Sequence, residues 1–173
     1  MKISIEVLEE PDKNWDERVL QNDGTIYQTT TYAKIQEKSL GMKTIYILAK
    51  NKSEIVGQLM LNHGPRFAKY LRRRFKRAYN FFEKYFKIYT FVRGPIIINK
   101  RLKKQIYSSI VDYLDKIAKK DAFMALDMSL PIKEEKSIYK LFYKKGFYLD
   151  SWGTVLIDVT KPEEILWNNI SRS

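Results

Sequence analysis

The sequence contains no cysteine and only one histidine, His63. The lack of cysteine excludes disulfide bonds, thiol nucleophiles and cysteine-ligated metal sites. A single histidine leaves a transition-metal site without its usual ligands and a serine triad with only one possible base. We therefore expect no metal site and interpret His63 as a structural residue.

Long hydrophobic runs are missing as well. No run of about eighteen apolar residues occurs, so no transmembrane helix is predicted. The opening sequence MKISIEVLEEPDKNW carries acids and few apolar residues, unlike a secretory signal peptide. We expect a cytoplasmic protein, and any membrane association is expected to be peripheral, at the inner face of the membrane.

Acidic residues are few: 20 Asp and Glu stand against 32 Lys and Arg, a formal net charge of +12. The excess is concentrated in residues 66–87, RFAKYLRRRFKRAYNFFEKYFK, where nine cations accompany one acid. Apolar residues recur there every three or four positions, which predicts an inserted basic amphipathic helix. Such a helix either presents a solvated basic face or binds an anionic phosphate-bearing partner, membrane lipid head groups or nucleic acid. The cations expected to contact that partner are Arg72, Arg73, Arg74, Lys76 and Arg77.

The remaining apolar residues predict the element order β-α-α-β-β-(inserted helix)-β-α-β-α-β-β-α. Strands are expected at residues 2–8, 44–49, 55–62, 88–92, 95–98, 123–128, 147–149 and 154–159, and helices at 12–22, 31–40, 102–117 and 133–145 and from 161 onward. This order indicates an α/β (α+β) fold, a mixed sheet flanked by helices that is similar to the GNAT acyltransferase fold.

Local signals predict several element ends. Thr30 or Thr31 is expected to cap the second helix and Gly41 to end it. Asn51 and Lys52 are expected to form a hairpin turn. A proline cannot donate to a strand ladder, so the pair at residues 94–95 predicts an edge, a bulge or an exit from the sheet.

The last helix has a strong start signal. Residues 160–163 spell T-x-x-E, a capping box with proline in the first turn. We expect residues 1–160 to form a single GNAT-like domain and residues 161–173 to begin a helix that connects to a second domain. The chain is accordingly expected to be a fragment, or a domain followed by more protein.

The GNAT fold holds the pyrophosphate of coenzyme A on a glycine-rich turn, R/Q-x-x-G-x-G/A, at the start of its central helix. The corresponding residues 93–99 read RGPIIIN, with one glycine and a proline in place of a donor. The phosphate-loop motif G-x-x-x-x-G-K-[ST] is absent too. We therefore predict no cofactor.

Asp127 is the candidate catalytic residue. It follows an apolar run at the carboxyl end of a predicted strand, where α/β folds commonly place functional groups. Partial burial there would raise the pKa of its carboxyl toward the range of a general base. The alternative is that Asp127 braces the turn that follows it.

Several segments match the motifs of one family in order. Residues 27–36, YQTTTYAKIQ, resemble Q-[ST]-x-x-W-A-x-[VI]-K, and residues 93–97, RGPII, resemble [RK]-G-P-[VI]. Residues 126–127 followed by Pro131 resemble F-D-P. The later pieces, G-[FY], T-x-x-[IL]-D-L-[ST] and L-W-x-x-[ILM]-[SK], are matched at residues 146–147, 154–160 and 166–171. Over residues 15–173, apart from the basic insertion, the chain thus resembles the FemAB/FemX peptidyltransferase family.

The resemblance implies two GNAT-like domains with a catalytic cleft between them, and this chain would be the first half. It implies transfer of an amino acid from aminoacyl-tRNA to an amine of a peptidoglycan precursor in the cell envelope, without metal or coenzyme A. The partners would be tRNA or lipid head groups and a second GNAT-like domain in cis, and the chain would be inactive alone.

The resemblance also implies a substrate site. The family's phosphate-binding lysine aligns with Gln36, where Lys34 or Lys38 could replace its charge, and a stacking tyrosine aligns with Ala122. The substrate-binding candidates are Tyr32, Lys34, Gln36, Lys38 and Arg93. Two other functions stay open: a non-catalytic module that binds membrane or RNA through residues 66–87, and a stand-alone GNAT acetyltransferase.

Overall fold

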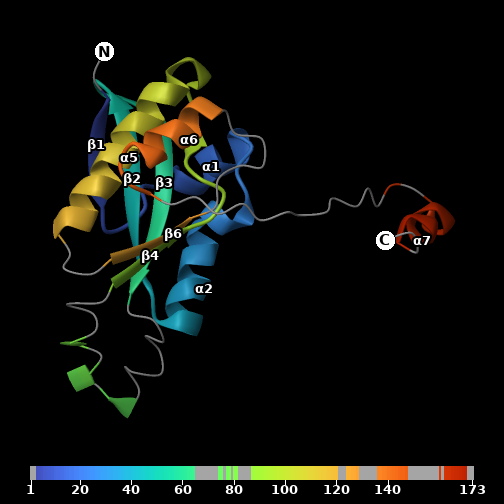
Figure 1. Ribbon diagram of the computed structural model, residues 1–173, viewed down its shortest axis with the longest axis horizontal. Coiled ribbons are helices and arrows are strands. Elements are labelled where there is room, and N and C mark those ends of the chain that lie inside the picture. The colour runs from blue at the N-terminus through green and yellow to red at the C-terminus, as the bar shows by residue number, and fades with distance from the viewer. Residues whose placement is uncertain are drawn as a thin grey trace.

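The computed structural model describes residues 3–64, 74, 75, 77, 78, 80, 81, 87–120, 124–128, 136–147, 160 and 162–170. Within them, a six-stranded sheet lies between two layers of helices (Figure 1). The strands are β1 (Ser4–Leu8), β2 (Lys43–Asn51), β3 (Glu54–Gly64), β4 (Lys87–Phe91), β5 (Ile96–Ile97) and β6 (Met124–Met128). The helices are α1 (Trp15–Gln21), α2 (Thr30–Leu40), α5 (Lys103–Lys120), α6 (Lys136–Tyr143) and α7 (Glu163–Ile170), with short 3-10 turns η1 (Ile26–Gln28) and η2 (Lys100–Leu102).

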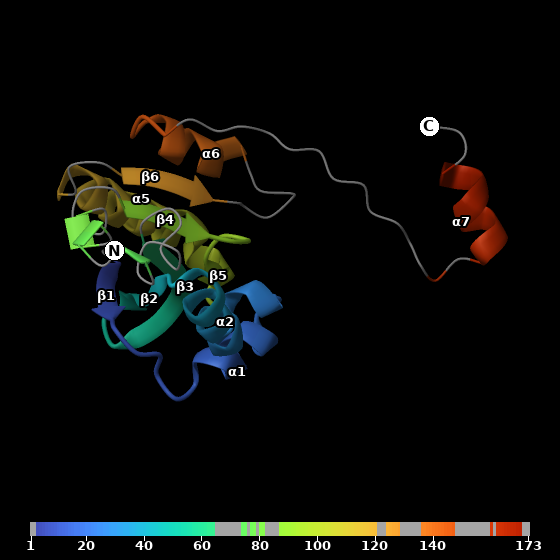
Figure 2. The same ribbon diagram turned by 90° about the horizontal axis from the view of Figure 1, so that it is seen from below.

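The sheet is mixed. Its order is β1-β2-β3-β4-β6, with β5 paired to β3. The pairs from β1 to β4 are antiparallel, whereas β6 runs parallel to β4 after the crossover through α5 (Figure 2). Parallel neighbours require such a crossover, usually a helix. The predicted α/β class, a mixed sheet flanked by helices, is confirmed.

Apolar residues on alternate faces of the strands form two cores, as the two-residue period of a strand requires. The larger core lies between the sheet and the α5–α6 layer and includes Ile47, Leu61, Phe91, Ile106, Ile110, Leu114, Ile138 and Phe142. The smaller core lies between the sheet and the α1–α2 layer and includes Trp15, Val19, Ala33, Tyr46, Leu48, Met60 and Ile96. Because both faces are covered, β3 is buried along most of its length.

Two local predictions were wrong by one residue. The N-cap of α2 is Thr29, whose hydroxyl accepts a hydrogen bond from the amide of Tyr32. The β2–β3 turn consists of Lys52 and Ser53, because Asn51 still pairs with Glu54 and it is Lys52 that adopts a left-handed φ of 56°. Helix α2 ends at Gly41 as predicted, with φ of 72°.

The predicted basic helix at residues 66–87 falls mostly outside the described residues. Arg74, Arg77, Ala78, Asn80 and Phe81 have helical backbone, but Arg72, Arg73 and Lys76 are not described. The strands expected at 147–149 and 154–159 also lie outside the described ranges. In the part that the structure describes, no helix has the length and apolar character needed to cross a bilayer.

Helix α7 begins at Glu163, two residues later than expected, and the amide of Ile165 donates to the carbonyl of Pro162 over 3.0 Å. It lies away from the sheet in both views (Figures 1 and 2). The division into a domain at 1–160 and a connecting helix at 161–173 stays a prediction.

Candidate functional site

The carboxyl ends of β4 and β6 lie at the same end of the sheet because the two strands are parallel (Figure 2). A row of polar residues crosses four strands close to that end. Thr44 on β2 pairs with Asn62 on β3, Asn62 pairs with Thr90 on β4, and Thr90 pairs with Asp127 on β6. The structure thus places the predicted catalytic residue at the end of a polar row.

Asn62 and Thr90 lie on the α1–α2 side of the sheet. Leu61 and Phe91, next to Asn62 and Thr90 in the chain, belong to the α5–α6 core, and neighbouring residues in a strand face opposite sides. Asn62 is only 3% exposed, and its Oδ1 accepts a hydrogen bond from the Thr44 hydroxyl over 2.7 Å. A buried amide is costly without hydrogen bonds, so Thr44 holds Asn62 in a defined orientation.

The chain leaves the ladder directly after β4. Strand β3 pairs with β4 at residues 62–64 and with β5 at residues 57–58, so residues 92–95 bulge between the two pairings. Arg93 and Gly94 both adopt left-handed φ angles, 68° and 71°. Only glycine adopts this conformation without strain, so the exposed Arg93 needs support from its surroundings. The predicted interruption at Gly94 and Pro95 is confirmed.

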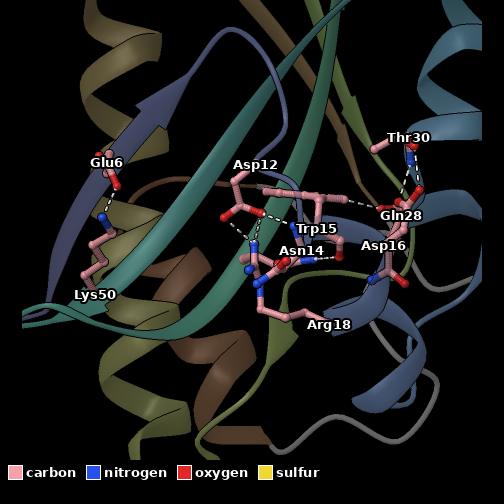
Figure 3. A network of polar contacts seen from close by, with 10 residues as sticks. Glu6, Asp12, Asn14, Trp15, Asp16, Arg18, Gln28, Thr30 and Lys50 are labelled. Carbon is pink, nitrogen blue, oxygen red and sulfur yellow. Dashed lines mark hydrogen bonds and ion pairs between the residues drawn. The ribbon is translucent and has the colours of Figure 1, made fainter.

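Gln28 supplies that support. Its side-chain Nε2 donates to the carbonyl of Gly94 over 2.9 Å, and its Oε1 accepts from the amide of Thr25 over 2.8 Å. Trp15 also holds Gln28 in place, because its indole N–H donates to the backbone carbonyl of Gln28 over 2.9 Å (Figure 3). Two segments 66 residues apart, both part of the motif series above, are therefore joined by a buried hydrogen bond.

Gln58 on β3 ties α1 to the sheet in the same region. It is 1% exposed, its Oε1 accepts from Nε of Arg18 over 2.7 Å, and its Nε2 donates to the carbonyl of Trp15 over 3.2 Å. Arg18 also donates to both carboxylate oxygens of Asp12 at 2.7 Å (Figure 3). Gln58 and Asn62 were not predicted from the sequence. The signal was their spacing, two polar residues on one face of an otherwise apolar strand.

The substrate-binding candidates on α2 occupy two stripes. Tyr32 and Gln36 are partly buried, and the Tyr32 ring packs edge-to-face on Tyr27 with centroids 5.1 Å apart. Lys34 and Lys38 are exposed, one turn apart. Tyr32 packs against the same small core as the residue that follows the bulge, Ile96, so the structure brings Tyr32 toward the Arg93 bulge and leaves the two lysines toward solvent.

Two further titratable groups, Tyr46 and His63, lie in the sheet. Burial raises the pKa of the Tyr46 hydroxyl, and the carboxylates of Asp16 and Glu37 raise it further, so Tyr46 stays protonated near neutral pH. His63 stacks on Tyr89 with ring centroids 5.4 Å apart. Within the described ranges, no three acidic or histidine side chains gather as they would around a metal ion.

The start of α5 is where the fold would hold the coenzyme A pyrophosphate. The amides of Ile98 and Asn99 both donate to the carbonyl of Val56 at 3.0 Å. The amide of Arg101 donates to the side-chain Oδ1 of Asn99 over 3.1 Å, and the amide of Leu102 donates to the backbone carbonyl of Asn99 over 3.0 Å. These four amides are engaged within the chain and do not fit that cradle.

A crossover from β4 through α5 to a parallel β6, a bulge after β4 and helices on both faces together define the GNAT fold. Neither a protein-family model nor a curated protein matches the sequence.

Solved structures match over nearly the whole chain. One is a ribosomal-protein-alanine N-acetyltransferase from Brucella melitensis biovar Abortus 2308, with a TM-score of 0.52 and 15% identity, covering 90% of this chain and 98% of that one. Another is a probable acetyltransferase, with a TM-score of 0.50 and 11% identity, covering 94% of this chain and 100% of that one. At such identities the likeness shows the fold alone. The GNAT-like fold is confirmed, and the FemAB resemblance stays a prediction.

Proposed function

We propose that this chain is an acyltransferase that binds an acceptor amine where β4 and β6 end, on the α1–α2 side of the sheet. The observation that carries the proposal is the polar row Asn62, Thr90 and Asp127, which runs across parallel strands beside the Arg93–Gly94 bulge. Catalytic groups of open α/β sheets commonly lie at such carboxyl ends.

The chemistry assigns a role to each residue of the row. The amine nitrogen attacks the carbonyl carbon of an activated acyl ester or thioester, a C–N bond forms, and the C–O or C–S bond to the leaving group breaks. Asp127 acts as the general base that takes the amine proton and returns it to the leaving oxygen or sulfur. Thr90 and Asn62 hold the acceptor by hydrogen bonds, with Asn62 oriented by Thr44.

A finer version of the proposal is FemAB-type transfer, from aminoacyl-tRNA to an amine of a cell-envelope precursor, completed by a second GNAT-like domain. Two observations support it. The Gln28–Gly94 hydrogen bond joins two of the segments that carry the resemblance, and the amides at the start of α5 are engaged within the chain. Tyr32, Lys34, Gln36, Lys38 and Arg93 would then contact substrate. A stand-alone acetyltransferase is the alternative, supported by neighbours whose chains are covered almost completely.

The test offers two donors, an aminoacyl-tRNA and acetyl-coenzyme A, with a panel of primary amines to the full-length gene product, because FemAB-type transfer would require the second domain. Product mass reports which acyl group is transferred, and thermal unfolding reports coenzyme A binding. Transfer from the tRNA ester supports the finer version, and transfer from the thioester supports the stand-alone enzyme. Asp127→Asn should abolish either activity, whereas Asp23→Asn, an exposed carboxylate near Lys100, should not. Equal activity of these two variants would remove Asp127 from the mechanism.

A non-catalytic anionic-surface function is the second candidate, and we propose it for the segment between β3 and β4. Arg74 and Arg77 are exposed there, and the aromatic rings of Phe75 and Phe81 are 54% and 53% exposed. Exposed cations beside exposed aromatic rings suit an anionic bilayer surface. In vesicle flotation, Arg74→Glu with Arg77→Glu should reduce recovery on vesicles that contain anionic lipid. Recovery equal to that of the wild type would remove the candidate.

A further inference from the structure

The outer side of the α5–α6 layer is strongly basic. Residues 103–120 and 136–147, which include both helices, carry nine lysines and two acids, Asp112 and Asp115. In contrast, α1 and α2 mix the two signs, with Asp16, Glu17 and Glu37 among their charged residues. The lysines are Lys103, Lys104, Lys116, Lys119, Lys120, Lys136, Lys140, Lys144 and Lys145.

Three of these lysines form a stripe along α6 and the turn that follows it. Lys136, Lys140 and Lys144 are spaced four residues apart and all are exposed. The buried residues Ile138 and Phe142 lie on the opposite side of the helix, against α5 and the sheet. At a rise of about 1.5 Å per residue, successive lysines of the stripe are about 6 Å apart along the axis.

The two acids do not neutralise this stripe because other cations already engage them. Asp115 Oδ2 lies 2.9 Å from Lys119 Nζ and 3.4 Å from Lys145 Nζ, and Asp112 Oδ1 lies 2.9 Å from Lys145 Nζ. A hydrogen bond from Lys119 lowers the pKa of the Asp115 carboxyl. Among the described residues, the stripe lysines have no acidic partner within ion-pair distance.

We propose that the outer face of α5 and α6 binds double-stranded nucleic acid through its phosphates. Clustered lysines neutralise phosphates whatever the base sequence, and binding releases counterions. Lysine is a point charge, unlike the fork of arginine that reads base edges, so the contacts hold the backbone only.

Other polyanionic partners fit this face less well. A bilayer surface requires apolar side chains to insert, but the only large apolar side chain strongly exposed on the described parts of these helices is Tyr143, at 56%. A single strand needs several aromatic rings on which bases stack, and Tyr143 is one ring. The exposed phenylalanines Phe75 and Phe81 lie in the segment between β3 and β4 and not on these helices.

The test measures binding of a short labelled DNA duplex by fluorescence anisotropy over a series of salt concentrations. Lys140→Gln with Lys144→Gln removes two phosphate contacts, so the slope of log K against log salt should shrink by about 1.8. Lys13→Gln with Lys52→Gln is the matched control, because it removes the same charge from exposed lysines outside this face. It should change the slope of log K against log salt by less than about 0.5. Matching thermal unfolding curves establish that both variants fold.

Three outcomes would overturn the proposal. One is an equal slope change in the two lysine variants, which would indicate net charge rather than a site. Another is a slope change confined to Arg74→Gln with Arg77→Gln, which would assign the contact to that segment. The third is tighter binding to a single strand, or to vesicles of mixed neutral and anionic phospholipid, than to the duplex.

Discussion

The two faces of the sheet are built differently. The α5–α6 side is packed with apolar side chains and places its charges on the outside, where Asp112, Asp115 and Lys145 link the two helices. On the α1–α2 side, the described residues include the three buried polar side chains Gln28, Gln58 and Asn62, each with a hydrogen-bond partner. The α5–α6 side is therefore the more apolar face, and the buried hydrogen bonds of the α1–α2 side fix where the bulge after β4 lies.

The largest loss of stability should come from a substitution in the core between the sheet and the α5–α6 layer. Phe142 is fully buried and packs edge-to-face on Phe147, with ring centroids 5.8 Å apart. Phe142→Ala should lower the free energy of unfolding by about 4 kcal/mol, because it removes buried surface and leaves a cavity. Chemical denaturation measures this loss. Tyr143→Ala, at the exposed neighbouring residue, should cost less than about 1 kcal/mol, and equal losses would contradict the assignment of the core.

The next effect should come from Gln58. Gln58→Leu leaves Nε of Arg18 and the carbonyl of Trp15 without their partner, which should cost about 2 to 3 kcal/mol. Combining it with Arg18→Leu should cost less than the sum of the two single changes, because the pair shares one hydrogen bond. A strictly additive result from denaturation would show that the two residues act independently.

A smaller and more local effect is expected at Gln28. Gln28→Leu removes the hydrogen bond to Gly94 and should cost about 1 to 2 kcal/mol. The change should also release the bulge, so amide hydrogen exchange at residues 93, 94, 96 and 97 should accelerate more than exchange within α5. Gln21→Leu is the control, since this exposed side chain bonds only to Glu17 in the described contacts. Faster exchange throughout the sheet would indicate a general loss of stability instead.

The smallest effect should be on the pH dependence of stability, through an ion pair on the outer side of α5. The Lys119 hydrogen bond holds the pKa of the Asp115 carboxyl below its ordinary value of 3.8. The stabilisation is therefore present above the pKa of the unfolded chain and is lost as the pH falls through the folded value. Asp115→Asn should flatten the acid limb of the curve of stability against pH. An unchanged acid limb would show that this ion pair contributes nothing measurable.

Much of the fold could be predicted because periodicity reports burial directly. The spacing of Ile106, Ile110 and Leu114 placed α5 correctly, and the proline after Gly94 located the bulge. The one-residue errors at Thr29 and Lys52 arose where neighbouring polar residues are equally suited to a cap or a turn. Only hydrogen-bond geometry decides between them.

The candidate site was harder to predict. Asp127 could be singled out because it follows an apolar run, but Asn62 and Thr90 could not, because each looks like an ordinary strand residue. Their significance depends on strand register, which joins positions far apart in the chain. The Gln28–Gly94 bond is equally invisible in sequence, since it spans 66 residues.

The parallel pairing of β4 with β6 has a consequence for folding. The β2–β3 hairpin closes over a two-residue turn, whereas β6 reaches β4 only after the whole of α5 has been crossed. Loop closure of that length is slow, so the hairpin should form early and β6 should dock late. Substitutions at Thr90 or Asp127 should consequently change the rate of unfolding more than the rate of folding. The candidate site, which lies on this pairing, should then assemble later than the β2–β3 hairpin.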